Sequence, residues 1–145
     1  QRAILRSIPG NLTGVASLRM GFNASYKRWM GSSANENLID VSNDDQFKSL
    51  LDDSTKSGQL VLVDFTAKWC GPCRMIAPTY ERLSSQNPSV LFLKVDIDNE
   101  KLESTVNEHN ITGVPTFVYY KNGRRVECFS GARAQMLEDL IVKHK

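Results

Sequence analysis

Cysteine and histidine are scarce in this chain of 145 residues, which contains three cysteines and two histidines. A structural zinc site needs four such ligands, usually in closely spaced pairs. Only Cys70 and Cys73 form a close pair, and Cys128, His109 and His144 are scattered elsewhere. We therefore predict no metal site, and we expect both histidines to be surface groups without partners.

Long apolar runs are also missing. No run approaches the roughly 18 to 20 residues that a membrane-spanning helix requires. A secretory signal needs an unbroken apolar core of about 7 to 15 residues, and Pro9-Gly10-Asn11 interrupts the only candidate. The sequence therefore predicts no contact with a membrane and no secretory signal.

Acidic residues are absent from residues 1–35, which contain five basic residues and five serines. Apolar residues, beginning with Ile4, Leu5 and Ile8, are spaced so that a helix formed by this segment would be amphipathic. These features are typical of an organelle transit peptide. We predict a transit peptide or disordered leader over residues 1–37 and a location in the mitochondrial matrix, with the plastid as the alternative. A disordered interaction tail is the other interpretation.

The positive charge of the chain belongs to this leader. The whole chain has a net charge of +2, but residues 37–145 contain 13 basic and 15 acidic residues. A nucleic-acid-binding domain would concentrate basic residues on one face. The charge balance therefore gives no support for a nucleic-acid partner, and we predict none.

Residues 38–145 alternate between short apolar runs and longer segments of helical periodicity. The pattern predicts strands near 38–41, 60–66, 90–96, 117–120 and 125–129. It predicts helices near 44–57, 70–86, 98–109 and 136–141. The run at 60–66 is apolar on both faces, as in a central strand covered by helices, and Asn122-Gly123 indicates a hairpin. We predict an α/β domain whose sheet starts parallel and ends antiparallel.

Cys70 and Cys73 stand where a strand ends and a helix is expected to begin. Residues three apart share one helical turn, close enough to form a disulfide. The helix N-terminus favours a thiolate at Cys70, Gly71 leaves the sulfur accessible, and Pro72 suits a first turn. Thiol–disulfide exchange is the predicted chemistry. Half of a zinc site and a structural disulfide are the alternatives, although a loop of about four residues would add little stability.

Asp64 lies inside the otherwise apolar run at 60–66. Burial of this carboxyl would raise its pKa and allow it to accept the proton of Cys73 when that thiol attacks. The alternative is that Asp64 ends the strand and reaches solvent or caps a turn.

Three short motifs resemble the thioredoxin family: Val63-Asp64-Phe65, the run Trp69–Cys73, and Val114-Pro115-Thr116. The resemblance covers about residues 38–145. The Gly-Pro pair between the cysteines is similar to thioredoxins proper, not to protein disulfide isomerases, glutaredoxins or periplasmic oxidants. The resemblance implies the thioredoxin fold, with a five-stranded mixed sheet and four helices on its two faces.

The resemblance also implies an activity: a protein-disulfide reductase that maintains redox homeostasis. Such a protein binds no cofactor and receives reducing equivalents from NADPH through thioredoxin reductase. Thioredoxin reductase and disulfide-containing clients such as peroxiredoxins would be its partners, and it would act as a monomer. Two other classes stay open, namely a binding module or processivity-type subunit without turnover, and a secretory oxidase or isomerase, which Gly71-Pro72 disfavours.

Individual residues receive roles in this interpretation. Cys70 would be the solvent-facing nucleophile, Cys73 the shielded resolving thiol and Asp64 the proton acceptor. By resemblance, Lys94 would tune Asp64, although a lone lysine on a strand is usually a solvated surface group. A cis bond before Pro115 would place the Val114 backbone beside Cys70, where a client strand can pair with it. The client-binding residues would be Trp69, Gly71, Pro72, Gly113, Val114, Pro115 and Gly131.

Trp69 and Cys128 each have an alternative interpretation. Trp69 would form a flat wall of the client groove, with a core tryptophan as the alternative. Cys128 is expected to be a bystander thiol, with regulatory oxidation or dimerisation as the alternative.

Overall fold

The computed structural model describes residues 35–145. Its five strands form one mixed sheet in the order β1-β3-β2-β4-β5. The strands are β1 (Leu38–Asp40), β2 (Val61–Thr66), β3 (Leu91–Asp96), β4 (Thr116–Lys121) and β5 (Arg124–Ser130). Strands β1 and β2 run parallel to β3, whereas β4 runs antiparallel to both β2 and β5. The predicted parallel start and antiparallel end are confirmed.

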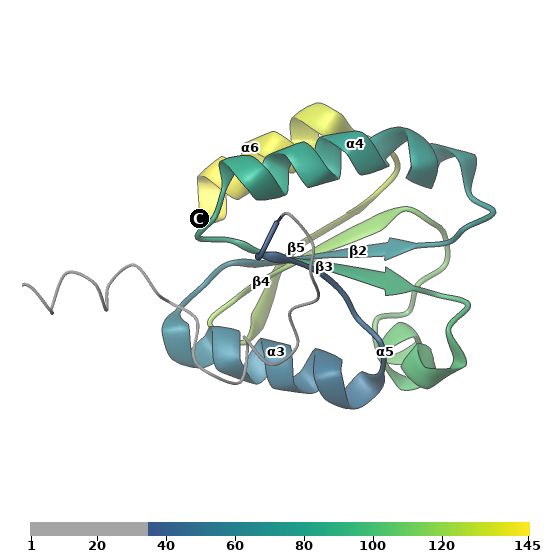
Figure 1. Ribbon diagram of the computed structural model, residues 1–145, viewed down its shortest axis with the longest axis horizontal. Helices are drawn as coiled ribbons and strands as arrows, with labels where there is room; N and C mark the ends of the chain where they lie inside the picture. The colour runs from purple at the N-terminus through teal and green to yellow at the C-terminus, as the bar shows by residue number, and fades with distance from the viewer. Residues whose placement is uncertain (1–34) are drawn as a thin grey trace, which may run out of the picture.

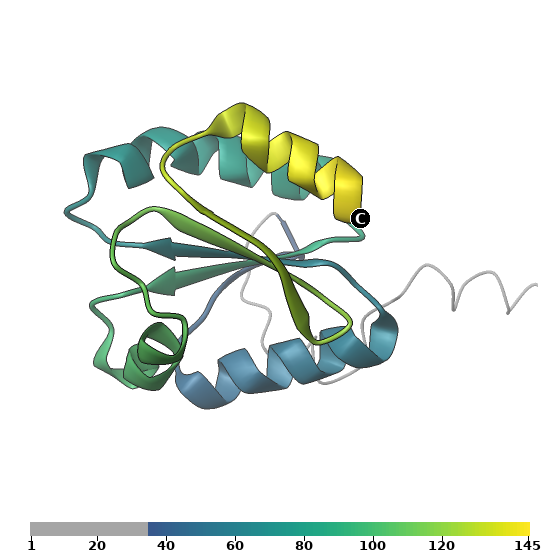
Figure 2. The ribbon, with the colours of Figure 1, turned by 180° about the vertical axis from the view of Figure 1, so that it is seen from behind.

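Four α-helices cover the sheet in the part of the chain that the structure describes. They are α3 (Asp44–Ser57), α4 (Gly71–Gln86), α5 (Glu103–Glu108) and α6 (Ala134–His144). Helices α4 and α6 lie on one face of the sheet, and α3 and α5 lie on the other (Figure 1). The view from behind shows the same three layers (Figure 2). The predicted α/β fold, with five strands and helices on both faces, is confirmed.

Apolar residues of the central strands fill the space between these layers. All five residues from Val61 to Phe65 are buried, because β2 has a neighbouring strand on each side and helices above and below. One apolar cluster packs Val61, Val63 and Phe65 against α3, and a second packs Leu60 and Leu62 against α4 and α6. The prediction of a central strand that is apolar on both faces is therefore confirmed.

Local signals place several boundaries where the sequence predicted them. The Asn43 side chain caps α3 by accepting a hydrogen bond from the Gln46 N–H, and Gly58 ends the helix in the left-handed conformation. Asn122 and Gly123 have φ angles of 52° and 75° between β4 and β5. Two consecutive positive φ angles are what a tight two-residue hairpin turn requires.

The continuous helix predicted over 98–109 is wrong. A short 3-10 helix, η1 (Glu100–Leu102), comes first, and α5 starts at Glu103 after a non-helical backbone conformation at Leu102. Asp44 of α3 explains the break, because its carboxylate accepts hydrogen bonds from both the N–H and the hydroxyl of Thr105. A residue far away in the sequence thus satisfies the first turn of α5.

Most of the predicted leader, residues 1–34, lies outside the described residues. Asn37 is buried, and its side-chain amide lies 2.8–3.0 Å from the carbonyl oxygens of Ser84, Asn87 and Val90. The segment just before β1 is therefore tied to the C-terminal end of α4. Within residues 35–145, no helix is both long and apolar enough to cross a membrane.

Candidate active site

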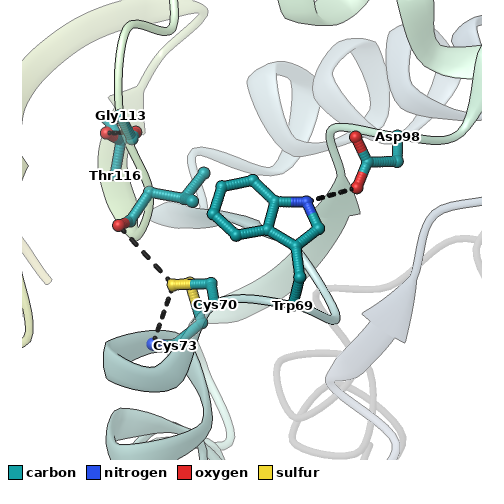
Figure 3. Close-up of a disulfide and its surroundings, with 7 residues drawn as sticks. Trp69, Cys70, Cys73, Asp98, Gly113 and Thr116 are labelled. Carbon is teal, nitrogen blue, oxygen red and sulfur yellow. Dashed lines mark hydrogen bonds between the residues drawn. A yellow bond between two sulfur atoms is a disulfide. The ribbon is translucent and has the colours of Figure 1, made fainter.

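The two close cysteines lie at the junction between β2 and α4. Cys70 is the N-cap of α4, and its Sγ accepts a hydrogen bond from the Cys73 N–H at 3.1 Å. The two residues form a disulfide, with their Cα atoms 5.3 Å apart (Figure 3). The Cys70 sulfur therefore lies at the positive end of a 16-residue helix, where backbone N–H groups stabilise negative charge.

In this disulfide form Cys73 is shielded as predicted, but the prediction that Cys70 faces solvent is wrong. The two residues are 3% and 4% exposed. As the N-cap, Cys70 turns its side chain in toward the helix, and the Val114 carbonyl oxygen lies 3.6 Å from its sulfur. Open space lies beside Gly71, where an added Cβ would meet no heavy atom within 4 Å.

Asp64 is buried in the middle of β2, with 3% of its surface exposed. Its Oδ1 has no hydrogen-bond partner among residues 35–145. Burial raises the pKa of Asp64 to about 7, and the positive charge of Lys94 partly opposes the rise. The alternative of a solvated or turn-capping carboxyl is excluded, and the predicted desolvated acid is confirmed.

A pocket of about 350 Å³ joins Asp64 and Cys73. Both residues line it, together with the basic residues Lys68, Arg74 and Lys94. The predicted proton transfer from Cys73 to Asp64 requires the two groups to be close, and the fold provides this by bringing the middle of β2 beside the first turn of α4. The pocket makes the carboxyl and the second thiol neighbours of the same water-accessible space.

Lys94 occupies the position of β3 that pairs with Asp64 of β2. Its side chain is partly buried, and its Nζ lies 3.9 Å from the Asp40 Oδ1. Its charge lowers the pKa of Asp64, against the larger effect of burial. Lys94 is thus placed to influence Asp64, as the resemblance implied, and is not simply a solvated surface lysine.

The loop before β4, which contains Val114 and Pro115, lies beside Cys70. The Val114–Pro115 peptide bond is cis, as the resemblance implied. Gly131 has a φ of 100°, which side chains rarely adopt, and its N–H donates to the Pro115 carbonyl oxygen at 2.9 Å. Gly113 faces open space. Gly131 therefore supports the backbone of this loop at Pro115, and no side chain or backbone atom crowds the loop at Gly113.

Trp69 lies on the surface beside the disulfide and is 66% exposed, so a core tryptophan is excluded. Its Nε1 donates a hydrogen bond to the Asp98 Oδ2 at 2.8 Å (Figure 3). Asp98 was not predicted as a site residue. It belongs to the loop after β3, and only the pairing of β2 with β3 brings it to Trp69.

The prediction that both histidines are surface groups without partners is wrong. His109 is 6% exposed, and its ring nitrogens bond to the Thr105 carbonyl oxygen and the Tyr120 hydroxyl. Its ring also packs against Phe65, with the centroids 4.8 Å apart. Burial lowers the pKa of His109. Aromatic partners on strands distant in sequence explain this placement, which local periodicity could not indicate.

His144 also has a partner, since its Nε2 lies 3.1 Å from the Glu127 Oε1. Cys128, by contrast, is a free cysteine and is exposed on β5. Within residues 35–145, no group of three or more His, Cys, Asp or Glu side chains is arranged to hold a metal ion. The Cys70–Cys73 pair and its surroundings are therefore the candidate active site.

Comparisons with known proteins agree with this site. The thioredoxin family profile matches residues 38–143. An H-type thioredoxin of Oryza sativa is 38% identical over 107 residues, which cover 74% of this chain and 86% of the relative. Thioredoxin H1 of Arabidopsis thaliana is 45% identical over 94 residues, covering 65% of this chain and 81% of the relative.

Solved structures give the same result. The crystal structure of Schistosoma mansoni thioredoxin is 42% identical, with a TM-score of 0.69, and the match covers 75% of this chain and 96% of that one. The crystal structure of the Nicotiana alata thioredoxin NaTrxh is 33% identical, with a TM-score of 0.72, and the match covers 79% and 98%.

These relatives overturn the predicted location in the mitochondrial matrix or the plastid. Similar proteins from Oryza, Nicotiana, Arabidopsis and Picea are H-type thioredoxins, a type that is typically cytosolic. The prediction depended on the composition of residues 1–35, and a basic segment without acids is not specific to one targeting receptor. A mitochondrial-type thioredoxin is likewise unsupported. The family itself is established: the chain belongs to the thioredoxin family and carries the Cys70–Cys73 pair of a thiol–disulfide oxidoreductase.

Proposed function

We propose that the chain is a protein-disulfide reductase that exchanges its Cys70–Cys73 dithiol with client disulfides. The observation that carries this proposal is the shared pocket of Cys73 and the buried Asp64, because it supplies a proton acceptor for the second thiol. A structural disulfide would need no such acceptor. In this proposal residues 38–145 are the catalytic domain, and Asn37, the last residue of the leader predicted over 1–37, packs against that domain.

The first step uses the reduced protein. The Cys70 thiolate attacks one sulfur of a client disulfide, the client S–S bond breaks, and a mixed disulfide forms between Cys70 and the client. The electron pair of the broken bond leaves with the other client sulfur, which takes a proton. The Cys73 N–H and the N-terminus of α4 favour the attacking thiolate, since both place positive charge beside it.

The second step resolves the mixed disulfide. Asp64 accepts the proton of Cys73, and the Cys73 sulfur attacks Cys70. The bond from Cys70 to the client breaks, and the client leaves as a thiol. With a pKa of about 7, roughly half of the Asp64 carboxyl is ionised near neutral pH, so it can both accept and release this proton. In total, two electrons pass to the client with two protons: the proton of Cys73, relayed by Asp64, and one from solvent, which replaces the proton that Cys70 lost when it ionised.

The surface beside Cys70 would bind the client. Trp69 offers an exposed flat ring, Gly71 has open space beside it, Pro72 is exposed, and the Val114 backbone lies beside Cys70. Lys94 acts only by tuning Asp64. The other client-binding residues are Gly113, Pro115 and Gly131, which shape the loop that carries Val114.

The oxidised protein must be reduced again for turnover. The family implies that NADPH supplies the electrons through thioredoxin reductase and that no cofactor is bound. Acting as a monomer, this chain would reduce disulfide-containing clients such as peroxiredoxins and so maintain redox homeostasis.

Reduction of insulin, coupled to NADPH and thioredoxin reductase, tests the proposal. The wild-type protein should consume NADPH and precipitate insulin chains, whereas Cys70→Ser should do neither. Cys73→Ser should accumulate covalent mixed disulfides with insulin, and the double variant Cys70→Ser, Cys73→Ser should trap none. A wild-type protein without insulin reduction would instead be a binding module that needs no turnover.

A further inference from the structure

Two hydroxyl groups form a directed chain of hydrogen bonds behind the loop that faces Cys70. Thr116, the first residue of β4, is buried, and its Oγ1 donates to the Gly113 carbonyl oxygen at 2.6 Å. Ser130 pairs with Thr116 across the β4–β5 ladder, and their hydroxyl oxygens are 2.8 Å apart. A hydroxyl has one hydrogen. Since Thr116 gives its hydrogen to the carbonyl, Ser130 must donate to Thr116.

This chain fixes the orientation of one peptide group. The Gly113 carbonyl points toward Thr116, and the peptide that joins Gly113 to Val114 is not among the cis bonds of residues 35–145. In a planar trans peptide the C=O and N–H point in opposite directions. The Val114 N–H therefore points away from Thr116 and the sheet behind the loop.

The Val114 N–H has no acceptor within residues 35–145, and neither has any other backbone N–H of residues 111–114. Pro115 has no N–H at all. The hydroxyl of Thr116 is thus the group that holds the Gly113 carbonyl in place, next to a glycine whose backbone is intrinsically free to rotate. Without this hydroxyl, the peptide between Gly113 and Val114 would have several accessible orientations.

We propose that Thr116 and Ser130 are positioning residues for client binding. Their hydroxyls hold the Gly113–Val114 peptide so that the Val114 N–H is presented to a backbone carbonyl of an extended client segment. The Val114 carbonyl oxygen lies 3.6 Å from the Cys70 sulfur, so this donor belongs to the same short stretch that borders the reacting atom. The inference rests on the proposed reductase function, and it concerns recognition of a peptide backbone, not the exchange chemistry.

The test compares two disulfide substrates. Insulin presents its disulfide on a peptide backbone, whereas 5,5′-dithiobis(2-nitrobenzoate) has no backbone. Thr116→Val removes the hydroxyl and keeps the side-chain shape, and Thr116→Ser keeps the hydroxyl as the matched control. We expect Thr116→Val to raise the KM for insulin roughly 5- to 10-fold, as expected for one well-placed hydrogen bond, with kcat and the reaction with the small disulfide nearly unchanged.

Thr116→Ser should restore the wild-type KM. Ser130→Ala, a change at an exposed position, should raise the KM roughly twofold to threefold, because it removes the donor to Thr116 and leaves the bond to Gly113. If Thr116→Val does not fold, Ser130→Ala with Ser130→Thr as its control carries the test. An unchanged KM, or equal losses with both substrates, would overturn the inference while the reductase function stands. Lack of insulin reduction by the wild-type protein would overturn both.

Discussion

The two sides of the Cys70–Cys73 disulfide are built from different kinds of groups. On the side of Cys73, a pocket contains the buried carboxyl of Asp64 beneath basic side chains. On the side of Cys70, an exposed Trp69 ring and the backbone of the loop ending at Pro115 form the surface. The pocket side carries the Asp64 carboxyl, whose pKa of about 7 makes its charge change near neutral pH. Substitutions on the pocket side should alter pH dependence and resolution, and those on the Cys70 side should alter client affinity.

The largest expected effect is on the pH dependence of stability. Asp64 has a pKa of about 7 in the folded protein, against 3.8 as an ordinary value, so the folded state binds more protons between these limits. The contribution of Asp64 to the free energy of unfolding is therefore largest below about pH 4, falls as the pH rises to about 7, and stays constant above that pH. The shift corresponds to roughly 4 kcal/mol.

Asp64→Asn should remove this dependence and be more stable than the wild type above pH 7, by a similar amount. Urea unfolding of the wild type and of Asp64→Asn, both with the disulfide formed, at pH 4, 5.5, 7 and 8 measures the difference. The free energies of unfolding should be close at pH 4 and diverge as the pH rises. Parallel curves would show that Asp64 titrates in the folded protein as it does in the unfolded chain.

The next effect is kinetic and also belongs to the pocket side. Asp64→Asn should slow the attack of Cys73 on the mixed disulfide by roughly 100-fold at pH 7, the lower end of what a positioned general base contributes. The first attack by Cys70 should change by less than about threefold, since a different group stabilises that thiolate. Rapid-quench separation of the two steps with a protein client measures both rates, and equal resolution rates would remove Asp64 from the mechanism.

A smaller effect tests how the pocket is tuned. Lys94→Met removes the charge that lowers the pKa of Asp64, so that pKa should rise above about 7, and the resolution step should need a higher pH. Lys68→Met is the matched control, because Lys68 lines the same pocket but is not among the groups that shift Asp64. The pH profile of resolution should move for the first variant only. Identical shifts in both would mean that the charge of the whole rim acts, not Lys94.

The smallest effect concerns the Cys70 side of the disulfide. Trp69→Ala should raise the KM for insulin a few-fold and leave the pH profile of resolution unchanged, because the exposed ring contacts clients and not Asp64. Asp98→Asn keeps an acceptor for the indole N–H and should have a weaker effect still. Steady-state kinetics over a range of pH measures both variants. A shifted pH profile in Trp69→Ala would break the separation between the two sides.

Local signals in the sequence determined much of the fold. Asn43 and Gly58 end α3 at the predicted places, and Asn122-Gly123 forms the predicted hairpin, because caps and tight turns depend on a few neighbouring residues. The apolar run around Asp64 predicted both a central strand and a buried acid. The spacing of Cys70 and Cys73 indicated the disulfide, and the resemblance at Val114-Pro115-Thr116 implied the cis bond.

Only the tertiary structure decided which distant groups meet. The pairing of β2 with β3 sets Lys94 beside Asp64, and the packing of α3 against Thr105 breaks the helix predicted over 98–109. His109 is buried because aromatic residues from other elements surround it. The physical reason is the range of the forces: helix caps and turns act over a few residues, whereas burial and hydrogen bonding between elements depend on how the whole chain packs.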